Sequence, residues 1–248
     1  MIGAKRQTAF WCAIVLPLLT LAMGCGDETG KVTWDNPFKD VMSNDAGKDT
    51  VDKAMDPNDA DKRRSAIVTL SSRPWCLKEP YTKFYAAALA GDRDALVRAA
   101  AATALGKCGD PNYVDTLAAA MDDTSTTVRW DTAIALDKVI GESAVDPLRS
   151  GAVEDKSADV RAACAKALRH YRRTDVGRAL VKCLDDNAFG VRHAAHASLV
   201  ELTGQDVGFG SYEWAKLVTE GVMTRPPAKK AWYEKDWGKP RTSANQPK

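Results

Sequence analysis

A Val-Arg dipeptide returns four times along this chain, and its nearly constant spacing constrains the fold more than any other feature. The copies begin 31, 32 and 31 residues apart, with an aspartate six residues before each arginine and a leucine seven residues after it. Three residue types held in one period indicate an array of repeats that pack on their neighbours. The four copies are Asp92, Val97, Arg98 and Leu105; Asp123, Val128, Arg129 and Leu136; Asp155, Val160, Arg161 and Leu168; and Asp186, Val191, Arg192 and Leu199.

Each repeat is predicted to be a pair of α-helices. After each Val-Arg, apolar or small residues recur on one face of a helix, as do Val97, Ala101 and Leu105 in the first copy. First helices lie between these second helices, and Pro80 and Pro111, 31 residues apart, suit their first turns. Short links between them make adjacent helices antiparallel. The predicted fold is therefore all-α: an α-solenoid of about five helix pairs forming a right-handed superhelix.

The two ends of the array depart from the regular repeat. Before the first regular copy, Lys62-Arg63 takes the Val-Arg position and Leu70 the leucine position. We expect this altered unit to cap the amino-terminal end. After the last copy, residues 202–214 resemble a closing motif that is common after such arrays in bacterial envelope proteins, and this resemblance implies that Phe209 and Trp214 cover the exposed face of the final repeat.

The aspartate and arginine of each repeat have a structural interpretation. The aspartate caps the helix that follows it, and the arginine reaches carboxylates and carbonyls of neighbouring loops. Binding of an anionic ligand by the arginines is the alternative, but repetition in every unit favours a structural ladder. The residues assigned to this ladder are Asp92, Asp123, Asp155, Asp186, Arg129 and Arg192.

Side chains of the second helices that point away from the core are predicted to line a groove. Trp130 is the strongest candidate for a binding contact, because the apolar stripe does not require an aromatic residue there. Packing of Trp130 against a neighbouring helix is the alternative. The residues assigned to the groove are Arg98, Trp130, Asp131, Arg161, His193 and His196.

The helix-pair pattern resembles HEAT repeats, in particular the short subtype named for phycobilisome lyases. The resemblance rests on the 31-residue period with aspartate and Val-Arg at fixed offsets, and it covers about residues 57–203. It implies a scaffold that binds a protein or peptide. The subtype also implies an alternative, a lyase-like protein that binds a chromophore or another small molecule.

The chain contains no Walker loop, nucleophile elbow, dinucleotide fingerprint or HExxH motif. His193 and His196 lie three residues apart on one predicted helix, but a metal site needs three or four ligands. We therefore predict neither a metal, nor a cofactor, nor catalysis. Four cysteines are expected to be mostly buried thiols, with at most one disulfide: Cys76, Cys108, Cys164 and Cys183.

Residues 1–24 have the pattern of a secretory signal, with Lys5 and Arg6 before an apolar run. Residues 21–25, Leu-Ala-Met-Gly-Cys, resemble a bacterial lipobox. This resemblance implies a lipoprotein whose mature chain begins at a lipidated Cys25, anchored to the cell envelope and facing the periplasm. An uncleaved membrane anchor is the alternative, but the apolar run of about 15 residues is shorter than the roughly 20 that a span requires.

Charge is unevenly distributed along the predicted mature chain. Residues 27–61 hold ten acidic and four lysine side chains, whereas residues 221–248 hold seven basic and two acidic ones interleaved with aromatic residues. The totals without residues 1–24 are equal, which argues against a nucleic-acid partner. The basic tail either docks a partner or folds back on the array, and we favour the second.

The predicted divisions are a signal at 1–24, an acidic flexible tether at 25–56, the array with its closing cap at 57–220, and a basic aromatic tail at 221–248.

Overall fold

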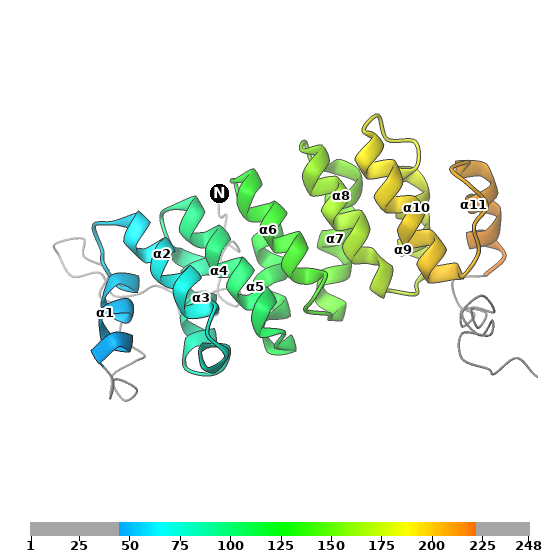
Figure 1. The fold of residues 1–248 in the computed structure, drawn as a ribbon. Helices are drawn as coiled ribbons and strands as arrows, with labels where there is room; N and C mark the ends of the chain where they lie inside the picture. Colours follow the sequence, from blue (N-terminus) through cyan, green and yellow to red (C-terminus); the bar gives the residue numbers. More distant parts are fainter. Residues whose placement is uncertain (1–44, 222–248) are drawn as a thin grey trace, which may run out of the picture. The chain divides into compact units, whose positions relative to one another are not determined.

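The computed structural model describes residues 45–221, in which all regular secondary structure is helical (Figure 1). Short 3-10 helices precede or extend several of the α-helices: η1 (Pro74–Cys76), η2 (Pro111–Tyr113), η3 (Ala120–Asp122), η4 (Glu142–Ala144) and η5 (Leu168–His170). The eleven α-helices of this range are α1 (Asp45–Ala54), α2 (Ala60–Ser71), α3 (Tyr81–Gly91), α4 (Ala95–Cys108), α5 (Val114–Ala119), α6 (Thr126–Leu136), α7 (Val145–Glu154), α8 (Ala158–Ala167), α9 (Thr174–Cys183), α10 (Phe189–Thr203) and α11 (Ser211–Thr219).

The helices form two layers that follow the chain order. The even-numbered helices from α2 to α10 pack side by side as the layer of second helices, each against the next. The first helices α3, α5, α7, α9 and α11 contact one another in the same succession and form the other layer (Figure 1). The predicted all-α solenoid of helix pairs is thus confirmed, and its right-handed superhelical twist stays a prediction.

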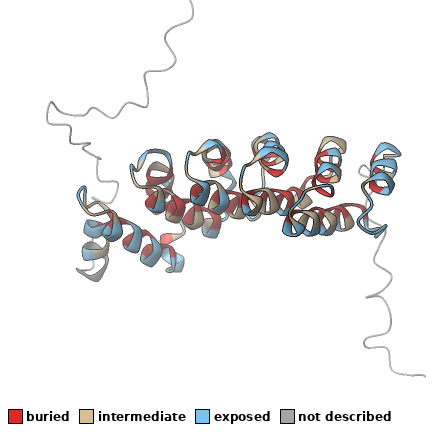
Figure 2. Ribbon diagram, turned by 90° about the horizontal axis from the view of Figure 1, so that it is seen from above, coloured by how far each residue is buried: buried red, intermediate tan, exposed pale blue. Residues whose placement is uncertain are grey.

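The repeated valines and leucines form the core between the layers. All four Val-Arg valines and all four leucines seven residues after the arginines are buried. Figure 2 shows the buried faces turned toward neighbouring helices and the exposed faces turned outward. Burying one such leucine contributes about 1.5–3 kcal/mol, so the periodic stripe supplies a large part of what holds successive repeats together.

The amino-terminal boundary of the array differs from the prediction. Residues 45–54, assigned to the flexible tether, form α1, which packs on α2 as the first helix of a fifth pair. Val51 and Ala54 are the apolar residues that α1 buries, and they lie three apart on one helical face. Because the segment is rich in acidic residues, its composition did not indicate this short apolar face.

The prediction for the carboxyl-terminal cap is correct for Trp214 but not for Phe209, which stacks on His196 and remains 48% exposed. Gly204 ends α10 in the left-handed conformation, with φ of 74°, and the chain then turns back over the last repeat. Trp214 on α11 is completely buried, and its indole N–H donates to the carbonyl of Gly208 at 2.6 Å. The tryptophan thus supplies the apolar cover that a further repeat would otherwise provide.

Several predicted segments lie outside the described residues. These are the signal at 1–24, Cys25, the tether before residue 45 and the basic tail after residue 221. Among the helices that the structure describes, none combines the length and apolar character needed to cross a membrane.

Candidate interaction surface

One ion pair connects each repeat to the next, and the described residues contain four such pairs. In every pair, Nε and Nη2 of an arginine donate to the two carboxylate oxygens of the following repeat's aspartate at distances of 2.7–3.1 Å. Such bidentate pairs fix the relative orientation of the two groups. We call the four pairs the Asp–Arg ladder: Arg63–Asp92, Arg98–Asp123, Arg129–Asp155 and Arg161–Asp186.

Each ladder residue also holds its own loop in place. Nη1 of Arg98 donates to the carbonyl oxygen of Asp92 at 2.8 Å, and the next two repeats repeat this bond at the same distance. The carboxylate of Asp123 accepts the N–H of Ser125, the residue before α6, at 2.8 Å. The aspartate therefore orders the turn before its own second helix, while the arginine connects that turn to the next repeat.

Hydrogen bonds from the arginines favour the charged form of the carboxylates of Asp123 and Asp186. Hydrogen bonding from Arg98 lowers the pKa of Asp123 below its ordinary value, although burial of the carboxyl acts in the opposite direction. Arg161 lowers the pKa of Asp186 in the same way. Because both partners are charged and mostly buried, loss of either one would leave an uncompensated charge inside the array.

The geometry corrects the placement of Arg98 and Arg161 in the groove. Their side chains are 15% and 13% exposed, and their guanidinium groups occupy the same ladder positions as that of Arg129. Arg63, in the altered first copy, does so as well. The position of an arginine in the repeat gives the helical face that carries its Cα atom. The long side chain can leave that face and turn toward the nearest carboxylate.

Trp130 and Asp131 lie together on α6, in the second-helix layer. Trp130 is 41% exposed, and its indole N–H has no hydrogen-bond partner among residues 45–221. The corresponding residues in the flanking repeats are Ala99 and Ala162, so the indole stands between small neighbours. Partial burial raises the pKa of Asp131, and no cation or N–H donor of the described residues compensates for it. An exposed aromatic ring and an unpaired carboxylate thus occupy consecutive positions of α6.

His193 and His196 have different surroundings although they lie one turn apart on α10. His193 is exposed, with its ring centroid 5.9 Å from that of Phe189. His196 stacks on Phe209 at 4.3 Å and bonds to Asp206 at 2.9 Å, so it belongs to the closing cap rather than to an open groove. Within the described range, no three potential metal ligands come together.

A charge cluster that the sequence pattern did not indicate lies at the end of α6. Asp137 is 11% exposed and lies within 3.0–3.5 Å of cationic or hydrogen-bonding groups of Lys166, Arg169 and His170. These partners come from α8 and η5 in the next repeat. Asp137 belongs to no periodic set, so the repeat spacing carried no signal for it. Its charge is satisfied internally, which gives it a structural role.

The four cysteines within the described range are free thiols. Burial raises the pKa of Cys76 and Cys108 to about 11 and that of Cys183 to about 12. The thiols are therefore protonated at neutral pH, and a thiolate is the form needed for nucleophilic attack. They behave as small apolar residues of the core.

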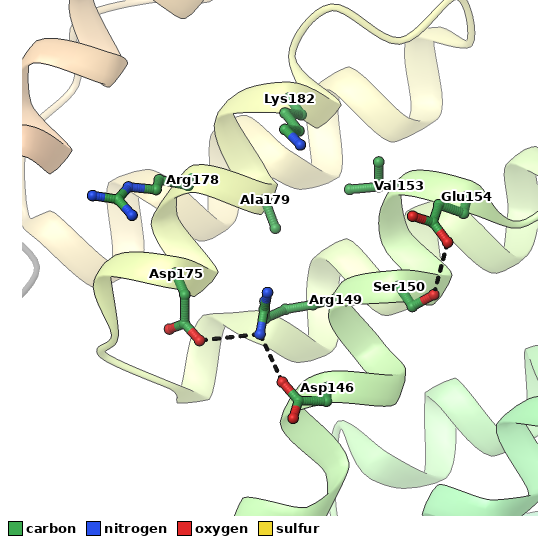
Figure 3. A pocket seen from close by; sticks show the side chains of 9 residues that line it. All are labelled: Asp146, Arg149, Ser150, Val153, Glu154, Asp175, Arg178, Ala179 and Lys182. Atoms are coloured by element: carbon green, nitrogen blue, oxygen red, sulfur yellow. Dashed lines mark hydrogen bonds and ion pairs between the residues drawn. The ribbon is translucent and has the colours of Figure 1, made fainter.

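A hollow of about 490 Å³ lies between the first helices α7 and α9 (Figure 3). Arg149 points across it and donates to Asp146 at 2.6 Å and to Asp175 at 3.1 Å. Ser150 and Glu154 bond to each other at 3.1 Å. Arg149, Asp146, Asp175, Ser150 and Glu154 thus bond with one another, and we assign no ligand to this hollow.

The comparison with protein families agrees with this geometry. Residues 82–169 match the family of HEAT repeats. The match extends from α3 to η5 and thus includes two complete ladder pairs, Arg98–Asp123 and Arg129–Asp155. No curated protein matches the chain.

Solved structures with similar folds include natural and designed repeat proteins. The Escherichia coli protein YibA is 24% identical with a TM-score of 0.55, and the match covers 71% of this chain and 62% of YibA. The CpcE–CpcF complex of phycocyanin lyase from Nostoc sp. PCC7120 is 20% identical with a TM-score of 0.56, covering 70% and 69%. A designed armadillo repeat protein in complex with the peptide (KR)4 is 17% identical with a TM-score of 0.54, covering 73% and 89%. At these identities the likeness establishes the fold, a HEAT- or armadillo-like solenoid.

Proposed function

We propose that this protein is a non-catalytic scaffold that binds a protein or peptide segment on its second-helix layer. The observation that carries the proposal is the pair Trp130–Asp131. A large indole with a free N–H is exposed at a position that flanking repeats fill with alanine. Tryptophan residues in such positions commonly dominate binding energy, because they combine a large apolar surface with one directional donor.

The electrostatics of the site indicate the chemistry of the partner. Partial burial disfavours the charged form of Asp131, and the described part of the chain provides no compensating donor. A lysine or arginine of a bound segment would restore the lost interaction while its aliphatic stem lay on the indole of Trp130. The designed armadillo repeat protein complexed with (KR)4 supports this as a fold-level precedent for binding a basic peptide.

Replacement of Trp130 by alanine tests the proposal. In affinity capture from solubilised cell envelopes, we expect the wild-type protein to retain a discrete partner and Trp130→Ala to retain at least tenfold less. Trp75→Ala is the matched control, because it removes a tryptophan of similar exposure, 51% against 41%, near the amino-terminal end of the array. Circular dichroism verifies folding of both variants. Capture of the same partner by all three proteins would refute the role of Trp130, and capture of none would favour the small-molecule alternative.

We further propose that Cys25 carries a lipid that anchors the scaffold to the bacterial envelope, facing the periplasm. The signal-like residues 1–24 and the lipobox-like sequence before Cys25 support this. In a bacterial expression host, metabolic labelling with palmitate is expected to mark the wild-type protein. Cys25→Ser is expected to lose the label and to accumulate as an unprocessed precursor. Palmitate labelling retained by Cys25→Ser would contradict the assignment.

A further inference from the structure

The last arginine of the repeat series is oriented like the others but has no aspartate. Nη1 of Arg192 donates to the carbonyl oxygen of Asp186 at 2.8 Å, the same bond at the same distance as in the preceding repeats. Its guanidinium plane is therefore held in the ladder orientation. The Nε–Nη2 edge, which binds a carboxylate in the four ladder pairs, has no carboxylate partner within residues 45–221.

At the amino-terminal end of the ladder, the carboxylate pairs with a cation of the same chain. Asp56, in the loop between α1 and α2, is the first carboxylate of the series within residues 45–221, because its carbonyl accepts Nη1 of Arg63 at 3.0 Å, and no arginine of the described residues pairs with its carboxylate. Nζ of Lys62 lies 3.2 Å from its carboxylate, which also accepts the N–H of Asn58 at 2.9 Å. Hydrogen bonding to Asn58 and Lys62 lowers the pKa of Asp56. The amino-terminal carboxylate thus has an internal cation, whereas the carboxyl-terminal guanidinium has no anion within the described residues.

An exposed aromatic ring lies beside the guanidinium group of Arg192. Phe189 is 65% exposed, and the guanidinium carbon of Arg192 lies 5.7 Å from its ring centroid. The equivalent residues of the regular repeats are small: Ala95, Thr126 and Ala158. The ring limits the directions open to the guanidinium, because the cation is attracted to its face. It also adds exposed apolar surface beside the guanidinium group.

We infer that Arg192 and Phe189 form a docking site for an aspartate turn of a partner protein, which would add one more pair to the ladder. The internal pairs define the ligand: an aspartate whose carboxylate accepts the N–H two residues later, directly before a helix. A guanidinium held in this orientation offers two parallel N–H donors, a geometry that suits carboxylates. This end-on site is separate from the Trp130 surface and stands or falls independently of it.

Nuclear magnetic resonance of the arginine side chains tests this inference on the whole protein. The probe is an amidated peptide with the sequence of residues 121–134, which contains the aspartate turn at Asp123. The Nε–Hε signal that disappears in Arg192→Lys identifies Arg192. We expect this signal to shift saturably on titration, and a peptide with Asp123→Asn to bind at least tenfold more weakly. Phe189→Ala is expected to weaken binding by about threefold, because only the ring contact is lost.

Arg173 provides the control signal, since its exposed guanidinium already pairs with Glu142 and Asp175. Its signal should not shift in a saturable way. Equal binding of the aspartate and asparagine peptides would overturn the inference. So would an Arg192 signal that the peptide does not move, since another part of this chain or a second copy would then occupy the edge. Dependence of that signal on protein concentration separates those two cases.

Discussion

Replacing Arg129 with alanine is expected to lower the free energy of unfolding by about 3 kcal/mol, the scale observed when one partner of a buried ion pair is removed. Asp155, the residue that Arg129 binds, is only 7% exposed and would lose its bidentate donor. Burial raises the pKa of Asp155, but the hydrogen bonds from Arg129 and from the N–H of Ser157, with the charges of Arg129 and Arg161, together lower it below its ordinary value, so that carboxylate is charged at neutral pH. The variant also loses the bond to the carbonyl of Asp123, which holds the loop before α6 within the same repeat.

Equilibrium denaturation in urea, monitored by circular dichroism, measures this loss. Arg173→Ala is the matched control, because Arg173 also bonds to two carboxylates but is 43% exposed. Exposed pairs contribute about 0–1 kcal/mol, so this variant should differ little from the wild type. Arg129→Lys should fall between the two, since an ammonium retains the charge but not the bidentate geometry. Equal losses in Arg129→Ala and Arg173→Ala would show that the ladder is not a stabilising device.

Replacing Gly106 with alanine is expected to destabilise the array by about 2 kcal/mol, the middle of the range for overpacking. A Cβ at Gly106 would lie 2.8 Å from the Cα and 2.9 Å from the Cβ of Ala135 on the neighbouring α6. Neither atom can rotate away, so α4 and α6 would have to move apart. The gain in helix propensity from glycine to alanine is at most about 1 kcal/mol, so the steric cost decides the sign.

Gly190→Ala is the control for this prediction. Gly190 also lies in a second helix, α10, but a Cβ added there would have no neighbouring atom within 4 Å. With no steric cost, the propensity gain should stabilise the protein by about 0.5 kcal/mol. Thermal unfolding of both variants would compare them directly. A stabilised Gly106→Ala would mean that α4 and α6 are less closely packed than the structure shows.

The repeat period predicted most of the fold because one physical requirement recurs in every unit. Each second helix must bury a stripe of valine, small residues and leucine, so the same spacing appears wherever such a helix occurs. The short helix α1 escaped prediction because it lies outside the regular copies. Its packing depends on Val51 and Ala54 within a segment whose composition is acidic.

The candidate surface was only partly predictable. Trp130 stood out because an aromatic residue interrupts an otherwise small-residue position, and the structure places it 41% exposed. The position of Arg161 in the repeat did not show whether its side chain lines the groove or belongs to the Asp–Arg ladder. Only the stacking of His196 on Phe209 in the closing cap showed that its surroundings differ from those of His193. These distinctions depend on where side chains end, which a helical offset does not specify.

The sequence by itself determined the helix-pair repeat, its register and the residues of the core. Residues that are buried at a regular interval appear as apolar residues at the same interval in the sequence. Only the tertiary structure decided which carboxylate each arginine binds, that Lys62 pairs with Asp56 at the amino-terminal end of the ladder, and that Arg192 has no carboxylate partner among residues 45–221. The reason is that these contacts join residues from different repeats, or lie at the ends of the stack where the period stops. Pairing across repeats depends on distances in space, and a one-dimensional spacing does not contain them.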